Sequence, residues 1–226
     1  AEERQVGQGL AEEAEAATEA VKAALEATQR QAEKTPAVQL AMMEAAAVEA
    51  ESSIVLDEAA TRAIIDQQLR DAGWEADTPS LRHAKGARPT KGRNLAIAEW
   101  PTETGPADYA LFVGLTLVGV VEAKRQNTNV MGVLRQAERY AAGIRVEPEL
   151  LADGAPWGPH RAPFAFSTNG RPYLRQLESA SGIWRRDLRR DTNPAGALTG
   201  WPAPQGLLDR LEVDQAAAEA TLAAQG

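Results

Sequence analysis

Three residues combine types and spacing that could carry chemistry: Asp108, Glu122 and Lys124. The two carboxylates offer the hard oxygen ligands that Mg²⁺ prefers beside water and phosphate oxygens, and the backbone carbonyl of Ala123 could add another. The lysine could neutralise the carboxylates as an ion pair, or it could orient or deprotonate a water that attacks a phosphodiester. These residues therefore indicate magnesium-dependent phosphodiester hydrolysis, with a buried ion pair at a strand end as the structural alternative.

Two adjacent strands would position these groups. Residues 108–113 and 117–124 are apolar runs that predict strands, and residues 114–116 predict a three-residue turn between them. Side chains two apart in a strand point to one face, so Glu122 and the lysine after it share a face. The hairpin then brings both beside Asp108, at one edge of the sheet.

The remaining periodicity predicts an α/β fold with a mixed sheet. Helices are expected over about residues 53–72, 130–144 and 207–224, and further strands over residues 95–100 and 163–168. Residues from about 10 to 51 are rich in Ala and Glu and predict two helices that break near Pro36. This N-terminal helical arm could dock on a partner or on the main domain, or form a surface hairpin, and the sequence leaves its role open.

Charge is unevenly distributed along the chain. The net charge of −8 divides into −11 for residues 1–80, +7 for residues 81–190 and −4 for residues 191–226. A basic middle segment is compatible with a surface that faces phosphate groups, or equally with a solvated face. Within a Pro-, Gly- and Arg/Lys-rich loop over residues 78–94, the candidate DNA contacts are Arg88, Lys91 and Arg93.

Composition excludes several kinds of site. The chain has no cysteine, which rules out disulfides, thiolate zinc sites and a cysteine nucleophile. With two histidines in all, His83 and His160, a histidine-rich metal centre is not expected. The N-terminus is acidic where a secretion signal would be basic, and no apolar run approaches the length of about 18 residues that a membrane span needs. We therefore expect a cytoplasmic protein that makes no contact with a membrane.

The spacing of the site residues resembles that of a known family. Pro106-Ala-Asp108, then thirteen residues, then Glu122-Ala-Lys124 is similar to the PD-(D/E)xK nuclease pattern, with an alanine inserted after the proline. The resemblance implies a restriction-endonuclease-like mixed sheet flanked by helices. It also implies that Asp108, Glu122 and the carbonyl of Ala123 bind Mg²⁺ and that Lys124 is catalytic.

A second element, Gln136-Ala-Glu-Arg-Tyr140, resembles the Gln-x-x-x-Tyr motif of RecB-like nucleases. The two side chains lie one helical turn apart and project together, so they could contact DNA phosphate or brace Lys124. Taken alone, the motif is also compatible with a core tyrosine beside an incidental glutamine. Glu58 resembles the acidic residue that many nucleases of this fold direct at the metal from the first helix, although it could equally be a helix-start charge that the dipole favours.

The order of motifs resembles, in particular, the R subunit of type I restriction enzymes over about residues 53–212. The segments that carry this resemblance are residues 58–74, 107–113, 120–124, 167–171 and 183–184. It implies an endonuclease domain that cuts double-stranded DNA beside modification and specificity subunits. The sequence has no Gly-x-x-x-x-Gly-Lys-Ser/Thr loop, so ATP is expected only for a motor outside it.

These patterns divide the chain into three parts and leave two other functions open. We expect a helical arm at residues 1–50, a nuclease domain at 51–190 and a linker or helix at 191–226 that leads towards an absent motor. One alternative is a non-catalytic DNA-binding or assembly module that kept a nuclease-like fold. The intact set of Asp108, Glu122 and Lys124 argues against it. The other alternative is a RecB-like DNA repair nuclease.

Overall fold

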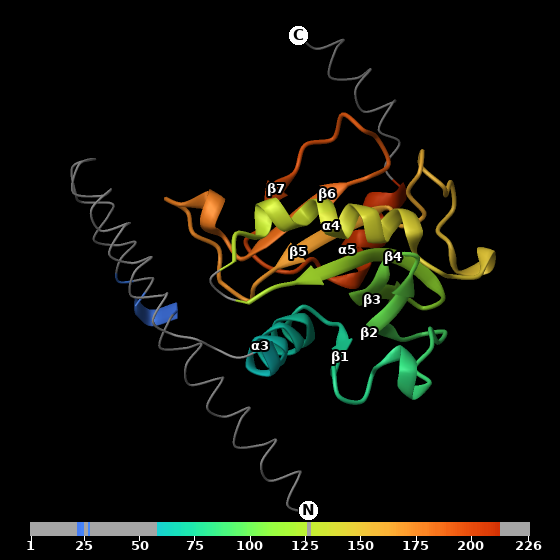
Figure 1. Cartoon of the computed structure of the whole chain (residues 1–226), viewed down its shortest axis with the longest axis horizontal. Helices are drawn as coiled ribbons and strands as arrows, with labels where there is room; N and C mark the ends of the chain where they lie inside the picture. The colour runs from blue at the N-terminus through green and yellow to red at the C-terminus, as the bar shows by residue number, and fades with distance from the viewer. Residues whose placement is uncertain (1–21, 25–26, 28–57, 126–127, 213–226) are drawn as a thin grey trace, which may run out of the picture.

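A mixed sheet forms the centre of the protein (Figure 1). The computed structural model describes residues 22–24, 27, 58–125 and 128–212. Within these residues the sheet has seven strands, which lie side by side in chain order. β1 pairs with β2, and β4 with β5, in parallel, and the other neighbours are antiparallel. The strands are β1 (Glu75–Ala76), β2 (Asn94–Thr102), β3 (Gly105–Val113), β4 (Thr116–Ala123), β5 (Phe164–Thr168), β6 (Ile183–Asp187) and β7 (Gly196–Ala197).

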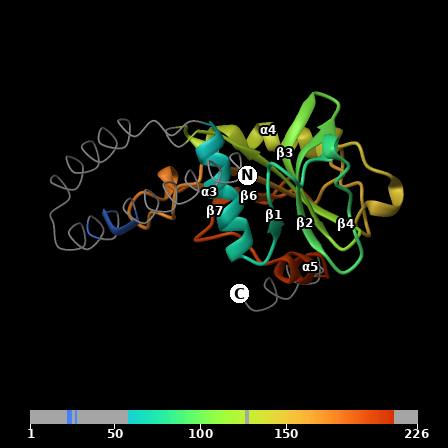
Figure 2. The ribbon, with the colours of Figure 1, turned by 90° about the horizontal axis from the view of Figure 1, so that it is seen from below.

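Helices cover both faces of this sheet (Figure 2). They are α3 (Glu58–Asp71), α4 (Val130–Gly143) and α5 (Pro204–Glu212), with 3₁₀ turns at His83–Lys85, Pro148–Leu150 and Glu178–Ala180. One buried cluster joins α4 to the face that carries Phe112 and Val120. A second cluster joins α3 and α5 to the face that carries Leu111 and Val121. This alternation between two buried faces confirms the predicted mixed α/β fold.

The β3–β4 hairpin differs from the prediction at its turn but has the expected register beside the site. Val113 pairs with Thr116, so the loop has two residues rather than three, and β4 begins one residue earlier than predicted. A bulge then places one additional residue, Val118, between the pairs Leu111–Gly119 and Phe112–Leu117. Beyond the bulge, Tyr109 pairs with Val121. The bulge replaces the third turn residue, because either one adds a single residue to β4.

The helix α4 forms the crossover between the parallel strands β4 and β5. It starts where the sequence predicted, because the Asn129 side chain accepts hydrogen bonds from the backbone N–H groups of Met131 at 3.0 Å and Gly132 at 3.4 Å. The strand β5 ends before Asn169, and Gly170 adopts a φ of 77°, which favours glycine. The crossover and this turn bring the segment after β4 beside the end of β5.

The core continues into the C-terminal part of the described chain. Trp201 and Leu207 are buried in the cluster beneath α3, and the Trp74 indole N–H donates to the carbonyl of Pro202 at 2.9 Å. Residues 1–50 of the expected arm lie outside the described residues apart from 22–24 and 27, and so do residues 213–226. The expected division into three parts stays a prediction. Among the described residues, no helix is long and apolar enough to cross a bilayer.

Candidate functional site

The two carboxylates approach each other because of the register beyond the bulge. The pairs Tyr109–Val121 and Ala110–Val120 place Asp108 opposite Glu122 when the register is continued by one residue. Residues directly opposite in an antiparallel pair share one face of the sheet. Asp108 Oδ2 accepts a hydrogen bond from the backbone N–H of Ala123 at 2.5 Å, which fixes the carboxylate beside the end of β4.

Glu122 is an almost fully buried acid beside a lysine. Its side chain is 3% exposed, and its Oε1 accepts a hydrogen bond from Lys124 Nζ at 2.5 Å. Burial, followed by the negative charge of Asp108, raises the pKa of Glu122 to about 7, although Lys124 acts in the opposite direction. Glu122 therefore shares its site with another carboxylate and has a high affinity for a proton or a cation.

Lys124 keeps its proton more firmly than an ordinary lysine. Its burial lowers the pKa, but the hydrogen bond and the charge of Glu122 act in the opposite direction. Electrostatic interactions with Asp108 and Tyr140 add to this effect, and the net result is a raised pKa for Lys124. At neutral pH the Nζ is an ammonium group that donates hydrogen bonds, so it is not a base in this state.

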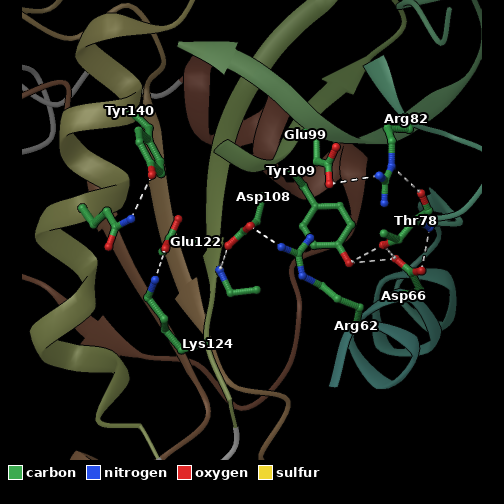
Figure 3. A network of polar contacts seen from close by, with 12 residues as sticks. Arg62, Asp66, Thr78, Arg82, Glu99, Asp108, Tyr109, Glu122, Lys124 and Tyr140 are labelled. Carbon is green, nitrogen blue, oxygen red and sulfur yellow. Dashed lines mark hydrogen bonds and ion pairs between the residues drawn. The ribbon is translucent and has the colours of Figure 1, made fainter. Parts of the chain in front are cut away.

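These groups line a cavity of about 260 Å³ between the start of α3 and the end of β4. The cavity could hold a hydrated cation and a phosphate group, since a water occupies about 30 Å³ of liquid. Figure 3 shows Glu122 and Lys124 on one side of Asp108 and Arg62 on the other. The residues that line the cavity are Thr61, Arg62, Asp108, Glu122, Ala123, Lys124, Arg125 and Thr128.

Arg62 is a residue of this site that the sequence analysis did not single out. Its Nη2 forms an ion pair with Asp108 Oδ1, and its guanidinium carbon lies 5.5 Å from the centroid of the Tyr109 ring. Tyr109 is in turn held by Asp66, to which its hydroxyl donates at 2.9 Å, and by Thr78 at 2.8 Å. No local motif marks Arg62, because its contact with Asp108 joins residues 46 positions apart.

Gln136 and Tyr140 project together from α4, as their spacing predicted. Gln136 Nε2 donates to the Tyr140 hydroxyl at 2.8 Å, and Tyr140 is close enough to Lys124 to affect its pKa. Tyr140 is also 8% exposed and belongs to the core cluster beneath α4. The tyrosine therefore packs in the core, and its hydroxyl is bonded to Gln136 near Glu122 and Lys124 (Figure 3). A contact of this pair with DNA phosphate or a bracing of Lys124 stays a prediction.

The basic loop residues lie away from the cavity. Arg93 forms an ion pair with Glu75 at 2.5 Å, and its carbonyl accepts from the N–H of Gly114 at the far end of the β3–β4 hairpin. That end is five residues along β3 from Asp108, or roughly 17 Å at the rise of a strand. Arg88 donates to backbone carbonyls, and Lys91 is exposed. Contact of these three residues with DNA stays a prediction.

The residues present fit a hard divalent cation. Asp108 and Glu122 are adjacent carboxylates, and their mutual repulsion contributes to the raised pKa of Glu122, which a cation would relieve. The described side chains contain no group of three or more acidic or histidine residues suited to a metal. Glu58, the remaining candidate ligand, is the first residue of α3, and its side chain lies outside the described residues.

Comparison with known proteins assigns the chain to a family. Residues 75–211 match the family described as the second domain of the type I restriction enzyme EcoKI endonuclease subunit. The chain belongs to this family. It is also 43% identical over 184 residues to the type I restriction enzyme EcoKI endonuclease subunit of Escherichia coli (strain K12). The predicted resemblance to the R subunit is thereby confirmed.

The match to this relative is partial. The alignment covers 69% of this chain but 16% of the EcoKI subunit. The matched family region begins at β1 and ends in α5, so it contains Asp108, Glu122, Lys124 and the α4 helix, whereas α3 precedes it. No solved structure matches the chain significantly.

Proposed function

We propose that this chain is the magnesium-dependent endonuclease domain of a type I restriction enzyme R subunit, and that it hydrolyses phosphodiester bonds of double-stranded DNA. The observation that carries the proposal is the convergence of Asp108, Glu122 and Lys124 on one cavity. Membership of the EcoKI endonuclease subunit family supports it independently. The Glu122 carboxylate is 3% exposed, and burying a carboxylate beside another is costly unless a cation compensates it.

Asp108 and Glu122, with the backbone carbonyl of Ala123, would hold Mg²⁺. When bound, the metal would activate water and stabilise the negative charge that develops on the phosphate. The N–H of Ala123 holds Asp108 Oδ2 at 2.5 Å, which orients the carboxylate before a ligand arrives. Lys124 would donate hydrogen bonds from its Nζ that orient the attacking water or stabilise a phosphate oxygen, because its raised pKa keeps it charged.

Tyr140 and Gln136 would act on the lysine side of the site. The Gln136 amide donates to the Tyr140 hydroxyl at 2.8 Å and so fixes its orientation. The hydroxyl can then present its own proton towards the reacting phosphate or brace the ammonium of Lys124. We therefore assign Tyr140 and Gln136 as supporting residues, with hydrolysis depending first on the two carboxylates and the lysine.

The proposed partners follow from the family. Double-stranded DNA is the substrate, and modification and specificity subunits would supply sequence recognition. ATP would serve the motor of the complete subunit, since the sequence has no phosphate-binding loop of the Gly-x-x-x-x-Gly-Lys-Ser/Thr type. Arg88, Lys91 and Arg93 could hold DNA at a distance from the reacting phosphate through salt-dependent contacts.

The experiment that tests the proposal joins magnesium calorimetry to nicking of supercoiled plasmid. Lys124→Ala should remain folded, bind magnesium and lose at least about a hundredfold in nicking rate. Asp108→Asn should lose both magnesium binding and nicking. The matched control is Asp209→Asn, which makes the same change of an acid to its amide at an exposed side chain outside the cavity lining.

Three outcomes would overturn the proposal. The first is equal nicking by the wild type and Lys124→Ala. The second is equal magnesium binding by the wild type and Asp108→Asn. The third is no magnesium binding by the wild type at millimolar magnesium with DNA present. Any of these results would favour a DNA-binding or assembly module without catalysis. Metal binding that depends on Asp108 but gives weak nicking would keep the site and indicate that cutting requires the rest of the subunit.

A further inference from the structure

Arg62 occupies a position in the cavity that the proposed reaction does not use. It projects from α3, and its Nη2 is paired with Asp108 Oδ1. The two side chains are 15% and 16% exposed, so water screens their interaction much less than on an open surface. The ion pair therefore involves the same carboxylate, Asp108, that is proposed to bind the metal.

The guanidinium of Arg62 contacts the Tyr109 ring as well as Asp108. Its carbon lies 5.5 Å from the centroid of the Tyr109 ring, at a distance suited to a cation–π contact. The ring cannot rotate away freely, since its hydroxyl is bonded to Asp66 at 2.9 Å and to Thr78 at 2.8 Å in a buried network (Figure 3). Asp66 and Arg62 both project from α3, so the same helix carries the guanidinium and the acid that fixes the ring beside it.

Both oxygens of Asp108 have partners in this arrangement. Oδ2 accepts from the N–H of Ala123, and Oδ1 accepts from Arg62. The backbone N–H is a fixed part of the β4 end, whereas the arginine is a side chain that can change rotamer. A divalent cation that binds Asp108 Oδ1 would therefore have to displace Arg62 from that oxygen.

We propose that Arg62 is an internal cation that holds Asp108 in the metal-free protein and competes with the divalent metal for it. Arg62 is thus a positioning residue that lowers the metal affinity of the site. The inference rests on the proposed function in one respect, namely that Asp108 binds the metal. It adds that the affinity depends on a residue from α3, outside the strands that carry the carboxylates and the lysine.

Calorimetric titration of the full chain with Mn²⁺, without DNA, tests this competition. Arg62→Met removes the charge and keeps an unbranched side chain, so Mn²⁺ should bind about tenfold more tightly, the effect expected when a competing charged hydrogen bond is lost. Arg62→Lys keeps a competing cation and should stay close to the wild type. Arg70→Met changes another arginine of α3, which bonds to Gln67 and the carbonyl of Ala76, and should leave the affinity unchanged.

An increase in affinity separates competition from structural damage, because damage to the site would weaken metal binding. Circular dichroism would show that each variant is folded, and if Arg62→Met does not fold, Arg62→Gln replaces it with the same expected increase. Unchanged or weaker Mn²⁺ binding by the folded neutral variant overturns the inference. If wild type binds Mn²⁺ through Asp108 in that case, the proposed function stands. If wild type binds no Mn²⁺, or Asp108→Asn binds it equally well, both proposals fail.

Discussion

Glu122→Gln should make the metal-free protein more stable at alkaline pH. The folded protein raises the pKa of Glu122 from 4.5 to about 7, mainly through burial and then through the charge of Asp108. Below pH 4.5 the group is protonated in both the folded and unfolded states and contributes nothing. Between pH 4.5 and 7 the unfolded chain ionises first, so the free energy of unfolding falls as the pH rises. Above pH 7 the group is ionised in both states, so the free energy of unfolding stays lower by the full amount.

The size of this loss follows from the shift. A difference between 4.5 and about 7 corresponds to about 3 kcal/mol at about 1.36 kcal/mol per pKa unit. The glutamine of the Glu122→Gln variant would have no charge to bury, and its amide oxygen could still accept the hydrogen bond that Lys124 now donates to Glu122. The variant should therefore gain up to about 3 kcal/mol at about pH 8, or roughly 6–12 °C in melting temperature for a chain of this size. At about pH 5 the gain should fall to less than about 1 kcal/mol.

Urea denaturation of both proteins between about pH 5 and pH 8.5, in the presence of a chelator, measures the difference directly. Glu103→Gln is the matched control, because Glu103 is an exposed acid in the β2–β3 turn and its replacement should change stability by less than about 0.5 kcal/mol. A gain for Glu122→Gln that does not change with pH would refute the argument from ionisation. A variant no more stable than wild type under alkaline conditions would show that the Glu122 charge is compensated in the metal-free protein.

Two further substitutions test the packing that supports the site, each by urea denaturation. Tyr109→Phe removes one of the bonds to the buried Asp66 and should cost about 1–3 kcal/mol, and a smaller loss would mean that water replaces the hydroxyl. Gly119→Ala should cost about 1–3 kcal/mol, because its Cβ would lie 3.0 Å from the Phe166 ring. Gly132→Ala on α4 is its control, since no heavy atom lies within 4 Å of that Cβ and helix propensity favours alanine, so a loss there would contradict the packing argument.

The strands that carry the site could be predicted from the sequence because their apolar runs are long. The predicted strands over residues 95–100, 108–113 and 117–124 correspond to β2, β3 and β4, with ends that differ by a few residues. The same approach failed for β6, where three of the five residues are charged, and for β1 and β7, which have two residues each. These strands form because a neighbouring strand offers hydrogen bonds, and a local pattern contains no such information.

The candidate site also contains some features that the local sequence predicts and others that depend on the tertiary structure. The convergence of Asp108, Glu122 and Lys124 on one cavity beside the end of β4 could be expected from alternation along two adjacent strands, which is a local property. These strands lie in the middle of the seven-stranded sheet and not at its edge, as the sequence analysis expected. The contact between Arg62 and Asp108 depends on how α3 crosses the sheet, and the sequence between them contains no motif that fixes this crossing. Likewise, the distance of Arg93 from the cavity follows from its place beside the β3–β4 turn, which charge patterning does not reveal.

Two irregularities in the strands beside Asp108 explain why the site has two carboxylates on one face. Without the bulge at Val118, β4 would shift by one residue, and Glu122 would point to the opposite face from Asp108. On the other side, Glu99 of β2 lies opposite Asp108, between the pairs Ala98–Tyr109 and Trp100–Ala107. A regular strand would direct Glu99 to the face of Asp108 and add a third acid there.

Glu99 avoids this because its φ is 52°, a left-handed conformation that is unfavourable for a residue with a side chain. Its carboxylate instead pairs with Arg82 at 3.1 Å (Figure 3). The site is therefore set by one added residue in β4 and one left-handed residue in β2. Regular alternation happens to predict the correct face for Glu122, since a three-residue turn and a two-residue turn with a bulge give one register. It predicts the wrong environment for Glu99, because an irregular backbone conformation leaves no trace in a pattern of apolar residues.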